Sequence, residues 1–423
     1  MSKKFQPLRG FSDLYPEKKA LQNWLFEKMR KVSLQFGYAE YEGPILESLS
    51  LYEAKSGQEL VAEQTFKFRD RSQRMVALRP ELTPTLARMI AAKSSQIPQP
   101  YRWFSIGPFF RYEKPQAGRT RQFYQWNVDL TGPSTPEADS EVIAMTAQFF
   151  QELGLDASQV VIKISDRKLV ETRLDIIGIP KSKFPQVSKI IDKRGKITKA
   201  EFESLLKRAG FDKSQIKDIG RILSDFDFAE ESDNLTAIFS NLKDAGFANY
   251  VTFDPSIVRG LDYYTGTVFE AYDRAGKFRA ILAGGRYDNL ISDFGGPKLG
   301  ACGFAAGDEV ILEVLEYFGK LPTVPLEPAK ILVTIFDEAT IRESLKLANF
   351  LRKEGIPTEF YPEITKLDKQ IRYALKKGIP YMAILGPEEA ARKTVTVKIL
   401  ATGEQFQVSQ EELPGLIKIG FRL

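Results

Sequence analysis

One stretch of the chain combines side chains that could bind an anion, an aromatic ring and a cation. Residues 121–130 alternate strictly, and one set of alternate positions holds Arg121, Phe123, Gln125, Asn127 and Asp129. Because successive side chains of a strand point to opposite faces, this set should share one face of a sheet. An arginine, an aromatic ring and a carboxylate in one row suit a phosphate, a planar base and an ammonium or imidazole group. A solvated outer face is the alternative interpretation.

The segment before this row should form its partner strand. We predict an aromatic-rich strand at residues 101–111 that ends at Arg111, with Glu113 two positions further on. A polar loop at 112–120 joins the two strands, and its proline and glycine interrupt strand pairing. The other alternate positions of the second strand can pack against a core: Tyr124, Trp126, Val128 and Leu130.

A second polar stretch lies at residues 257–271. It contains the run RGLDYY at 259–264, which lacks the spacing of a core-facing helix or strand and so favours a binding role for Arg259 over a structural one. The segment AGGRYDNL follows at 283–290, and its adjacent glycines allow a ligand to approach the backbone closely. Upstream, Glu81 and Thr83 stand at the start of a helix predicted from about residue 83. Their alternative role is a helix cap and a favourable charge near the helix start.

Composition excludes several kinds of chemistry. The chain has no histidine and a single cysteine, Cys302. Imidazole bases, internal disulfides and nearly every kind of zinc site are therefore excluded, and the cysteine usage suits a reducing cytoplasm. No apolar run approaches the length of a membrane span, and the N-terminal residues lack the apolar core of a secretion signal. We expect a cytoplasmic protein with no membrane partner and no zinc.

The elements around these stretches are predicted from periodicity and from proline and glycine positions. In the first 165 residues we expect a helix at 17–36, a strand at 38–45, a hairpin at 66–78, a helix at 137–153 and a strand at 160–164. Residues 166–246 should be helical, and within them residues 181–221 carry 12 Lys/Arg and 5 Asp/Glu. Such a basic block suits a polyanion, although a solvated lysine-rich face is an equal alternative. Residues 303–315 should run from strand to helix.

A proline-rich linker at 321–328 precedes a smaller domain. After it, strands and helices alternate, which indicates a mixed sheet with helices packed on it. On the helix predicted at 366–377 the apolar positions should face inward: Leu367, Ile371 and Ala374. The basic positions line another side, as an RNA-binding surface or a solvated stripe: Lys366, Lys369, Arg372 and Lys376.

The polar stretches resemble a known family. Residues 110–125, FRYEKPQAGRTRQFYQ, resemble motif 2 of the class II aminoacyl-tRNA synthetases in its histidyl-tRNA synthetase form, and residues 259–264 resemble that family's histidine-specific motif. The helix and strand at 17–45 resemble motif 1, and residues 303–315 occupy the motif 3 position. The resemblance implies an α+β catalytic domain with an antiparallel sheet at 1–325, a helical insertion at about 166–246, and a C-terminal α/β anticodon-binding domain at 326–423.

The resemblance also assigns roles to individual residues. It makes Arg259 and Arg111 catalytic. It implies that six residues bind histidine: Glu81, Thr83, Gln125, Asp129, Tyr263 and Tyr264. It implies that ATP is bound by Arg111, Glu113, Arg121 and Phe123. The nucleotide would bring Mg²⁺ with it.

The activity implied is ATP-dependent ligation of histidine to tRNA(His) through a histidyl-adenylate, by a homodimer. One alternative is a histidine-sensing regulatory paralogue without aminoacylation activity, and another is a tRNA-binding protein without chemistry. The chain departs from the family at Val310, where relatives usually carry an arginine that contacts the γ-phosphate of ATP. Arg119, Arg121 or Arg286 could replace it. The chain is also a histidine-free variant, with Tyr112 and Tyr124 at positions where relatives often carry histidine. This absence is explained either by selection or engineering against the enzyme's own substrate, or by drift.

Overall fold

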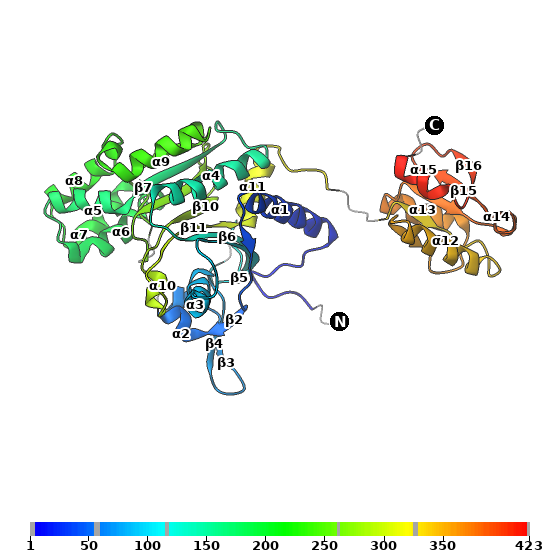
Figure 1. Cartoon of the computed structure of the whole chain (residues 1–423), viewed down its shortest axis with the longest axis horizontal. Coiled ribbons are helices and arrows are strands. Elements are labelled where there is room, and N and C mark those ends of the chain that lie inside the picture. The colour runs from blue at the N-terminus through cyan, green and yellow to red at the C-terminus, as the bar shows by residue number, and fades with distance from the viewer. Residues whose placement is uncertain (1–4, 55–59, 115–117, 260–262, 325–328, 421–423) are drawn as a thin grey trace. The chain divides into compact units, whose positions relative to one another are not determined.

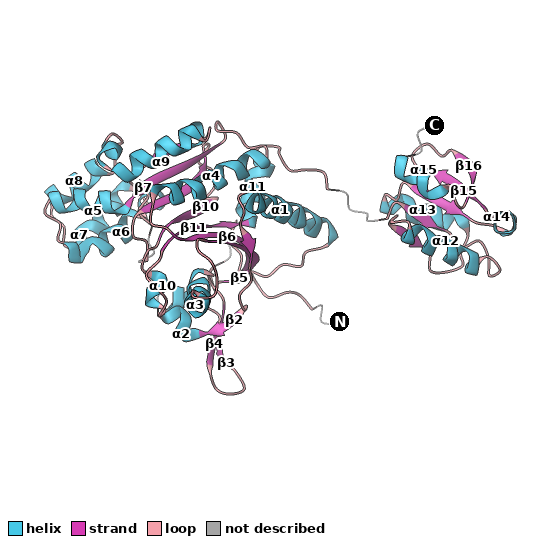
Figure 2. Cartoon of the chain, in the orientation of Figure 1, coloured by secondary structure: helices cyan, strands magenta, loops and turns pink. Residues whose placement is uncertain are grey.

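The computed structural model of the chain describes residues 5–54, 60–114, 118–259, 263–324 and 329–420. Its contacts divide the chain into two compact units, Met1–Pro322 and Thr323–Leu423. Figure 1 traces the elements of each unit, and Figure 2 distinguishes their helices from their strands. Among the described residues, no helix combines the length and the apolar character that crossing a bilayer requires.

Within the described part of the first unit, the main sheet has eight strands in the order β1-β5-β6-β11-β10-β9-β7-β8. The run from β5 to β7 is antiparallel, whereas β1 and β8 pair in parallel at the two edges. The strands are β1 (Ala39–Glu40), β5 (Tyr101–Phe110), β6 (Gln122–Gly132), β7 (Val160–Asp166), β8 (Val251–Phe253), β9 (Thr267–Asp273), β10 (Leu282–Arg286) and β11 (Gly300–Gly307).

One face of β6 is fixed against the core. Trp126 is fully buried, its indole N–H donates to Ser33 Oγ at 2.9 Å, and its ring lies 4.7 Å from that of Phe149. Val128 and Leu130 join the same core cluster. Since side chains alternate along a strand, the odd-numbered residues of β6 must face the other way. Four helices contribute most of the helical residues of this cluster: α1 (Pro16–Gln35), α4 (Pro136–Glu152), α9 (Asp233–Asp244) and α11 (Asp308–Tyr317).

Two smaller groups of elements flank the main sheet. Four helices build a separate apolar cluster and gather at one end of the unit, beyond β7 (Figure 1). They are α5 (Arg167–Ile176), α6 (Phe184–Ile191), α7 (Lys199–Arg208) and α8 (Lys213–Ile222). The second group is a small antiparallel sheet with three short helices: β2 (Leu46–Ser48), β3 (Lys67–Arg69), β4 (Met75–Leu78), α2 (Leu49–Glu53), α3 (Thr83–Lys93) and α10 (Leu290–Asp293).

The second unit has its own mixed sheet, in the order β13-β12-β14-β15-β16. Strand β12 pairs in parallel with β13 and β14, and the remaining pairs are antiparallel. Its elements are β12 (Ile331–Val333), α12 (Ile341–Lys353), β13 (Thr358–Phe360), α13 (Leu367–Lys377), β14 (Tyr381–Ile384), α14 (Pro387–Arg392), β15 (Thr394–Ile399), β16 (Gln405–Ser409) and α15 (Leu413–Ile419).

Most predicted elements are confirmed within a few residues, but the strand predicted at 38–45, as an edge strand or one that ends at Pro44, is too long: β1 lies at the edge of the sheet and has two residues. Only Ala39–Glu40 pairs with β5, and the chain re-enters a sheet at Leu46–Ser48. Pro44 has no N–H to donate, so it cannot continue a ladder. Gly43 lies so close to α3 that an added Cβ would stand 2.5 Å from Thr85 Cγ2. On α13 the predicted inward face is confirmed, since Ala374 is buried and packs in an apolar cluster with Leu367 and Ile371.

Candidate active site

A cavity of about 540 Å³ in the first unit brings together nearly all the residues that the sequence singles out. Its volume is typical of small-molecule sites. The predicted residues that line it are Glu81, Thr83, Arg111, Glu113, Phe123, Gln125, Asp129, Arg259, Tyr263 and Tyr264. They come from β6, from the loops after β5 and β8, and from the start of α3. Ile191, Asp192 and Arg194 of the helical insertion also reach this lining.

The odd-numbered residues of β6 form one wall of the cavity. Phe123, Gln125, Asn127 and Asp129 all line it, which confirms the predicted alternation. The ring of Phe123 stacks with Phe109 of β5 at a centroid distance of 6.0 Å. Asp129 stands six positions after Phe123, so this wall spans roughly 20 Å along the strand. One strand therefore serves two ends of the cavity, and we refer to them as the Arg111 end and the Asp129 end.

Arg111 follows the last residue of β5 and stands beside Phe123. Its Nε donates to the carbonyl of Pro80 at 2.9 Å, and its guanidinium carbon lies 5.3 Å from the Phe123 ring centroid. Burial lowers the pKa of Arg111, and the carboxylates of Glu81 and Glu113 offset only part of this effect. The Glu113 carboxylate itself pairs with Arg119 Nε at 2.7 Å. This end of the cavity thus holds guanidinium groups close to an aromatic face.

Arg259 lines the same cavity from a segment far along the chain, and the next residues of its motif, 260–262, lie outside the described residues. Its φ is +55°, in the left-handed region that arginine rarely adopts. Its Nη1 pairs with Glu270 Oε1 at 2.5 Å, and the Tyr272 hydroxyl donates to the other Glu270 oxygen. Burial alone would lower the pKa of Arg259, but Tyr264 and Glu270 outweigh it and raise that pKa overall. Glu270 of β9 therefore fixes where this guanidinium points.

The Asp129 end is built around a buried carboxyl group. Asp129 is 6% exposed, and the Tyr287 hydroxyl donates to its Oδ1. Burial raises the pKa of Asp129 to about 7, although the hydrogen bond from Tyr287 acts in the opposite direction. Asp129 pairs in register with Gly303 of β11, where an added Cβ would stand 2.2 Å from Asp129 Oδ1. A glycine is required at position 303 to leave room for this carboxyl group.

Two tyrosines extend the Asp129 end. The rings of Tyr263 and Tyr264 lie 4.8 Å apart, and Tyr263 lies 5.9 Å from the ring of Tyr287. Burial raises the pKa of both Tyr263 and Tyr264, so their hydroxyls stay protonated and can donate hydrogen bonds.

Glu81 and Thr83 line the cavity where α3 begins. Glu81 is buried, and Thr83 is the first residue of the helix. The N-cap position is Leu82, which forms no side-chain cap hydrogen bond, and Thr83 follows it as the first helical residue. The alternative role of Thr83 as a helix cap is therefore wrong.

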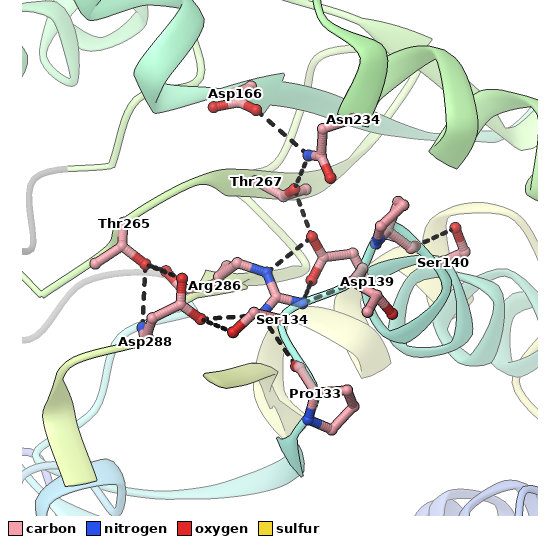
Figure 3. A network of polar contacts seen from close by, with 12 residues as sticks. Pro133, Ser134, Asp139, Ser140, Asp166, Asn234, Thr265, Thr267, Arg286 and Asp288 are labelled. Atoms are coloured by element: carbon pink, nitrogen blue, oxygen red, sulfur yellow. Dashed lines mark hydrogen bonds and ion pairs between the residues drawn. The ribbon is translucent and has the colours of Figure 1, made fainter. Parts of the chain in front are cut away.

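Two of the predicted arginines lie elsewhere. Arg121 is not among the cavity residues, since it precedes β6 and stacks over Tyr112 at 3.9 Å while its Nε donates to the Glu113 carbonyl at 3.2 Å. Arg286 is 5% exposed and lies in the polar network of Figure 3, where it pairs with Asp139 at 2.6 Å and Asp288 at 2.9 Å. The structure brings neither of them to the place beside Val310.

Sequence reasoning missed several residues of the cavity. Arg279 lines it from the segment between β9 and β10, and Lys163 lines it from β7, where it pairs with Asp254 at 2.8 Å. Tyr287 belongs to the AGGRYDNL segment, and Glu270 stands six residues after the tyrosine pair. Both segments have an unusual composition, so a polar residue at a strand position within them is the available sequence signal.

Comparisons with known proteins point to one family. A family model described as Histidyl-tRNA synthetase matches residues 10–311, and one described as Anticodon binding domain matches residues 330–419. A chloroplastic/mitochondrial histidine–tRNA ligase from Arabidopsis thaliana is 38% identical, over 96% of this chain and 85% of the relative. A histidine–tRNA ligase from Leptospira biflexa is 37% identical, over 97% of this chain and 96% of the relative.

Solved structures agree with this result. A crystal structure of histidyl-tRNA synthetase from Nostoc sp. PCC 7120 superposes with a TM-score of 0.81 at 25% identity, covering 99% of this chain and 100% of that one. A structure from Bacillus halodurans described as an ATP phosphoribosyltransferase regulatory subunit/histidyl-tRNA synthetase has a TM-score of 0.72 at 22% identity, over 88% of this chain and 97% of that one, and shows a shared fold alone. The match to residues 10–311 and the relatives above 30% identity show that the chain belongs to the histidyl-tRNA synthetase family of class II aminoacyl-tRNA synthetases.

Proposed function

We propose that this protein ligates histidine to tRNA(His) at the expense of ATP, through a histidyl-adenylate. The observation that carries the proposal is the convergence of Arg111 and Arg259 on one cavity that also contains the buried carboxyl of Asp129. Two guanidinium groups from distant segments can hold one phosphate from two directions while an amino acid occupies the space beside them.

ATP would bind at the Arg111 end, with Mg²⁺ carried on its phosphates. Phe123 would stack on the adenine, and Glu113 would accept a hydrogen bond from the adenine amino group. Arg111 would grip the α-phosphate, because its only assigned hydrogen-bond partner in the described chain is a neutral carbonyl and its charge is available to an anion. Arg121 would contribute only indirectly, by holding the Glu113 carbonyl at the base of the loop.

Histidine would bind at the Asp129 end. A neutral imidazole has one N–H donor and one acceptor nitrogen. Asp129 would accept the N–H, Tyr264 would donate to the other nitrogen, and Tyr263 would line the pocket. Glu81 and Thr83 would hold the α-amino group, and Gln125, midway along the β6 wall, would help to fix the amino acid. Buried polar groups of this kind reject ligands that leave them unpaired, by a factor of about 10⁴ or more.

The chemical step is the in-line attack of the histidine carboxylate on the α-phosphorus, with pyrophosphate as the leaving group. Negative charge spreads over the phosphate oxygens in the transition state, so fixed cations on both sides lower the barrier. Arg259 would supply the second cation, held in place by Glu270 and by a constrained backbone. No side chain need accept a proton in this step, which is consistent with a chain that has no histidine.

The transfer step requires tRNA(His), and the polynucleotide would contact both units. We assign residues 1–325 to the catalytic domain and 326–423 to the anticodon-binding domain. In the second unit, α13 exposes a basic stripe made of Lys366, Lys369, Arg372 and Lys376. In the first, the exposed lysines of the helical insertion would meet the acceptor arm, and binding should weaken steeply with salt. The enzyme would work as a cytoplasmic homodimer.

Histidine-dependent exchange of labelled pyrophosphate into ATP tests the proposal. We expect exchange that requires histidine and Mg²⁺, followed by charging of tRNA(His) transcripts when these are added. Exchange without charging would reject the ligase function as a whole. Histidine binding without any exchange would instead support the regulatory alternative, and tRNA binding alone would support a protein without chemistry.

A further inference from the structure

Two further arginines, Arg119 and Arg279, accompany Arg111 at its end of the cavity. Arg111 and Arg119 come from the β5–β6 connection and Arg279 from the β9–β10 connection, and all three line the cavity. Two carboxylates accompany them: Glu113, which pairs with Arg119, and Glu313 of α11, which lies outside the lining residues. Arg279 forms no ion pair in the part of the chain that the structure describes, and its one assigned hydrogen bond goes to the carbonyl of Gly118. A neutral carbonyl orients this guanidinium, and no direct ion pair among the described residues neutralises its charge.

The segment that carries Arg279 is held in a defined conformation. The Asp273 carboxylate accepts the backbone N–H groups of Lys277 and Phe278, each at 2.9 Å. The ring of Phe278 packs edge-to-face against Tyr317 of α11 at 5.8 Å, and the Lys277 ammonium lies 4.1 Å from the same ring centroid. Arg279 therefore projects from a segment anchored to both β9 and α11, which is how proteins position a binding group in advance.

Helix α11 contributes no cation near this segment. Gly118, whose carbonyl Arg279 contacts, lies against α11, since a Cβ added there would stand 3.4 Å from Val310 Cγ2 and 2.9 Å from Glu313 Oε2. Val310 lines the cavity but is 2% exposed and offers no charge. Burial lowers the pKa of Arg279, the neighbouring cations Arg119 and Arg111 lower it further, and the carboxylates of Glu113 and Glu313 offset only part of this effect. An anion bound among these three groups would relieve their mutual repulsion.

We infer that Arg279 binds the β- and γ-phosphates of ATP, and that it supplies from the β9–β10 segment the cation that Val310 does not supply from α11. The inference deepens the proposed function and rests on it for the identity of the ligand. An adenine base on Phe123 and an α-phosphate at Arg111 leave the phosphate tail to extend along this group of arginines. A fork of N–H donors suits such a tail better than a point charge does.

The test compares the binding of MgATP and AMP to the full chain by isothermal titration calorimetry. Arg279→Ala should weaken MgATP binding by about 10–100-fold, the usual worth of a hydrogen bond to a charged group, and leave AMP binding within about twofold. Arg279→Gln keeps a donor for the Gly118 carbonyl and removes the charge, so it should lose nearly as much affinity for MgATP. Arg274→Ala is the matched control. It removes the same charge from the same segment, but Arg274 contacts the carbonyls of Ala157 and Asn249 outside the cavity lining.

Three results would overturn the inference. If Arg279→Ala bound MgATP as tightly as the parent, Arg279 would not contact the phosphates. If it lost equal affinity for MgATP and AMP, Arg279 would contact the part that both ligands share. Parent-like behaviour of Arg279→Gln alone would reduce Arg279 to an anchor of the Gly118 backbone. These measurements need no histidine activation. If the parent showed no pyrophosphate exchange but bound MgATP through Arg279, the proposed function would fail and this inference would stand.

Discussion

At the Arg111 end of the cavity three guanidinium groups accumulate, whereas at the Asp129 end a buried carboxyl group stands among tyrosine hydroxyls. Burial acts against the charged form at both ends. It lowers the pKa of Arg111 and Arg279, and it raises the pKa of Asp129 to about 7. The neighbouring groups at each end therefore offset only part of the cost of burying its charge. A triphosphate would supply negative charge at one end, and the N–H of an imidazole would supply a donor at the other.

Arg259 differs from both ends because its partner is already present. Its ion pair with Glu270 at 2.5 Å raises its pKa despite burial, and its left-handed backbone fixes the direction of the side chain. From this comparison we expect groups that bind a ligand, such as Arg111 and Arg279, to have no direct ion pair, while a group that stabilises a transition state is held rigidly by one. The variants below are ways to break or sharpen that distinction.

Arg259→Ala should have the largest effect. Loss of one fixed transition-state donor lowers a rate by about 10²–10³, so histidine-dependent pyrophosphate exchange should fall by that factor. The KM for ATP should change by less than about tenfold, because Arg111 and Arg279 still bind the phosphates. An exchange rate within a few-fold of the parent would reject the role of Arg259. Arg74→Ala, on the exposed hairpin before β4, controls for loss of a positive charge.

Asp129→Ala should affect the binding of histidine at the Asp129 end and leave the Arg111 end unchanged. Removing the acceptor for the imidazole N–H should raise the KM for histidine by about 100-fold and leave MgATP affinity within about twofold. In Asp129→Ala the Tyr287 hydroxyl also loses its acceptor, so Tyr287→Phe is the control. It should raise the KM for histidine much less. An unchanged histidine KM in Asp129→Ala would remove this residue from the pocket and with it the contrast between the two ends.

Local periodicity was enough to predict the β6 wall, because a strict alternation admits only two faces and Trp126 settles which one is buried. The same reasoning could not place Glu270 or Tyr287. Glu270 faces the cavity because β9 pairs with β10 and β7, and Tyr287 reaches Asp129 across a sheet whose strands are distant in sequence. Such contacts depend on strand order, which no local pattern encodes.

The arginines show the same limit. Arg121 and Arg286 looked suitable as replacements at position 310, but their partners are distant along the chain: the Arg9 carbonyl lies 3.4 Å from Arg121, and Asp139 of α4 pairs with Arg286. Arg279 belongs to no recognised motif, so the sequence alone does not predict that it lines the cavity. Its place in the cavity follows from the turn that Asp273 shapes, a tertiary feature that composition does not reveal.

The carboxyl of Asp129 should make the stability of the fold depend on pH. Its pKa is about 7 in the fold, compared with about 4 for an exposed aspartate. Between these values the folded chain keeps a proton that the unfolded chain has lost, so stability falls as the pH rises, until the group ionises in the fold near pH 7. We therefore expect the free energy of unfolding of Asp129→Asn, measured in urea relative to the parent, to increase by about 2 kcal/mol between pH 5.5 and pH 7.5. If the difference in the free energy of unfolding between variant and parent stayed constant over this range, the raised pKa of Asp129 would be contradicted.

Glu270→Gln should have the smallest effect of the four and tests whether Arg259 needs its partner. The substitution preserves the size of the side chain and an oxygen for Arg259, but it removes the charge that opposes the cost of burying the guanidinium. We expect kcat for exchange to fall about tenfold, equivalent to roughly 1.4 kcal/mol, with the KM for histidine unchanged. Glu171→Gln breaks a comparable pair, with Arg167 at 3.0 Å on α5, and should leave kcat unaltered. If Glu270→Gln instead tightened ATP binding without slowing exchange, Glu270 would be masking Arg259 from the phosphate. Arg259 would then belong with the phosphate-binding cations of the Arg111 end, and the distinction between binding groups and a rigid catalytic group would fail.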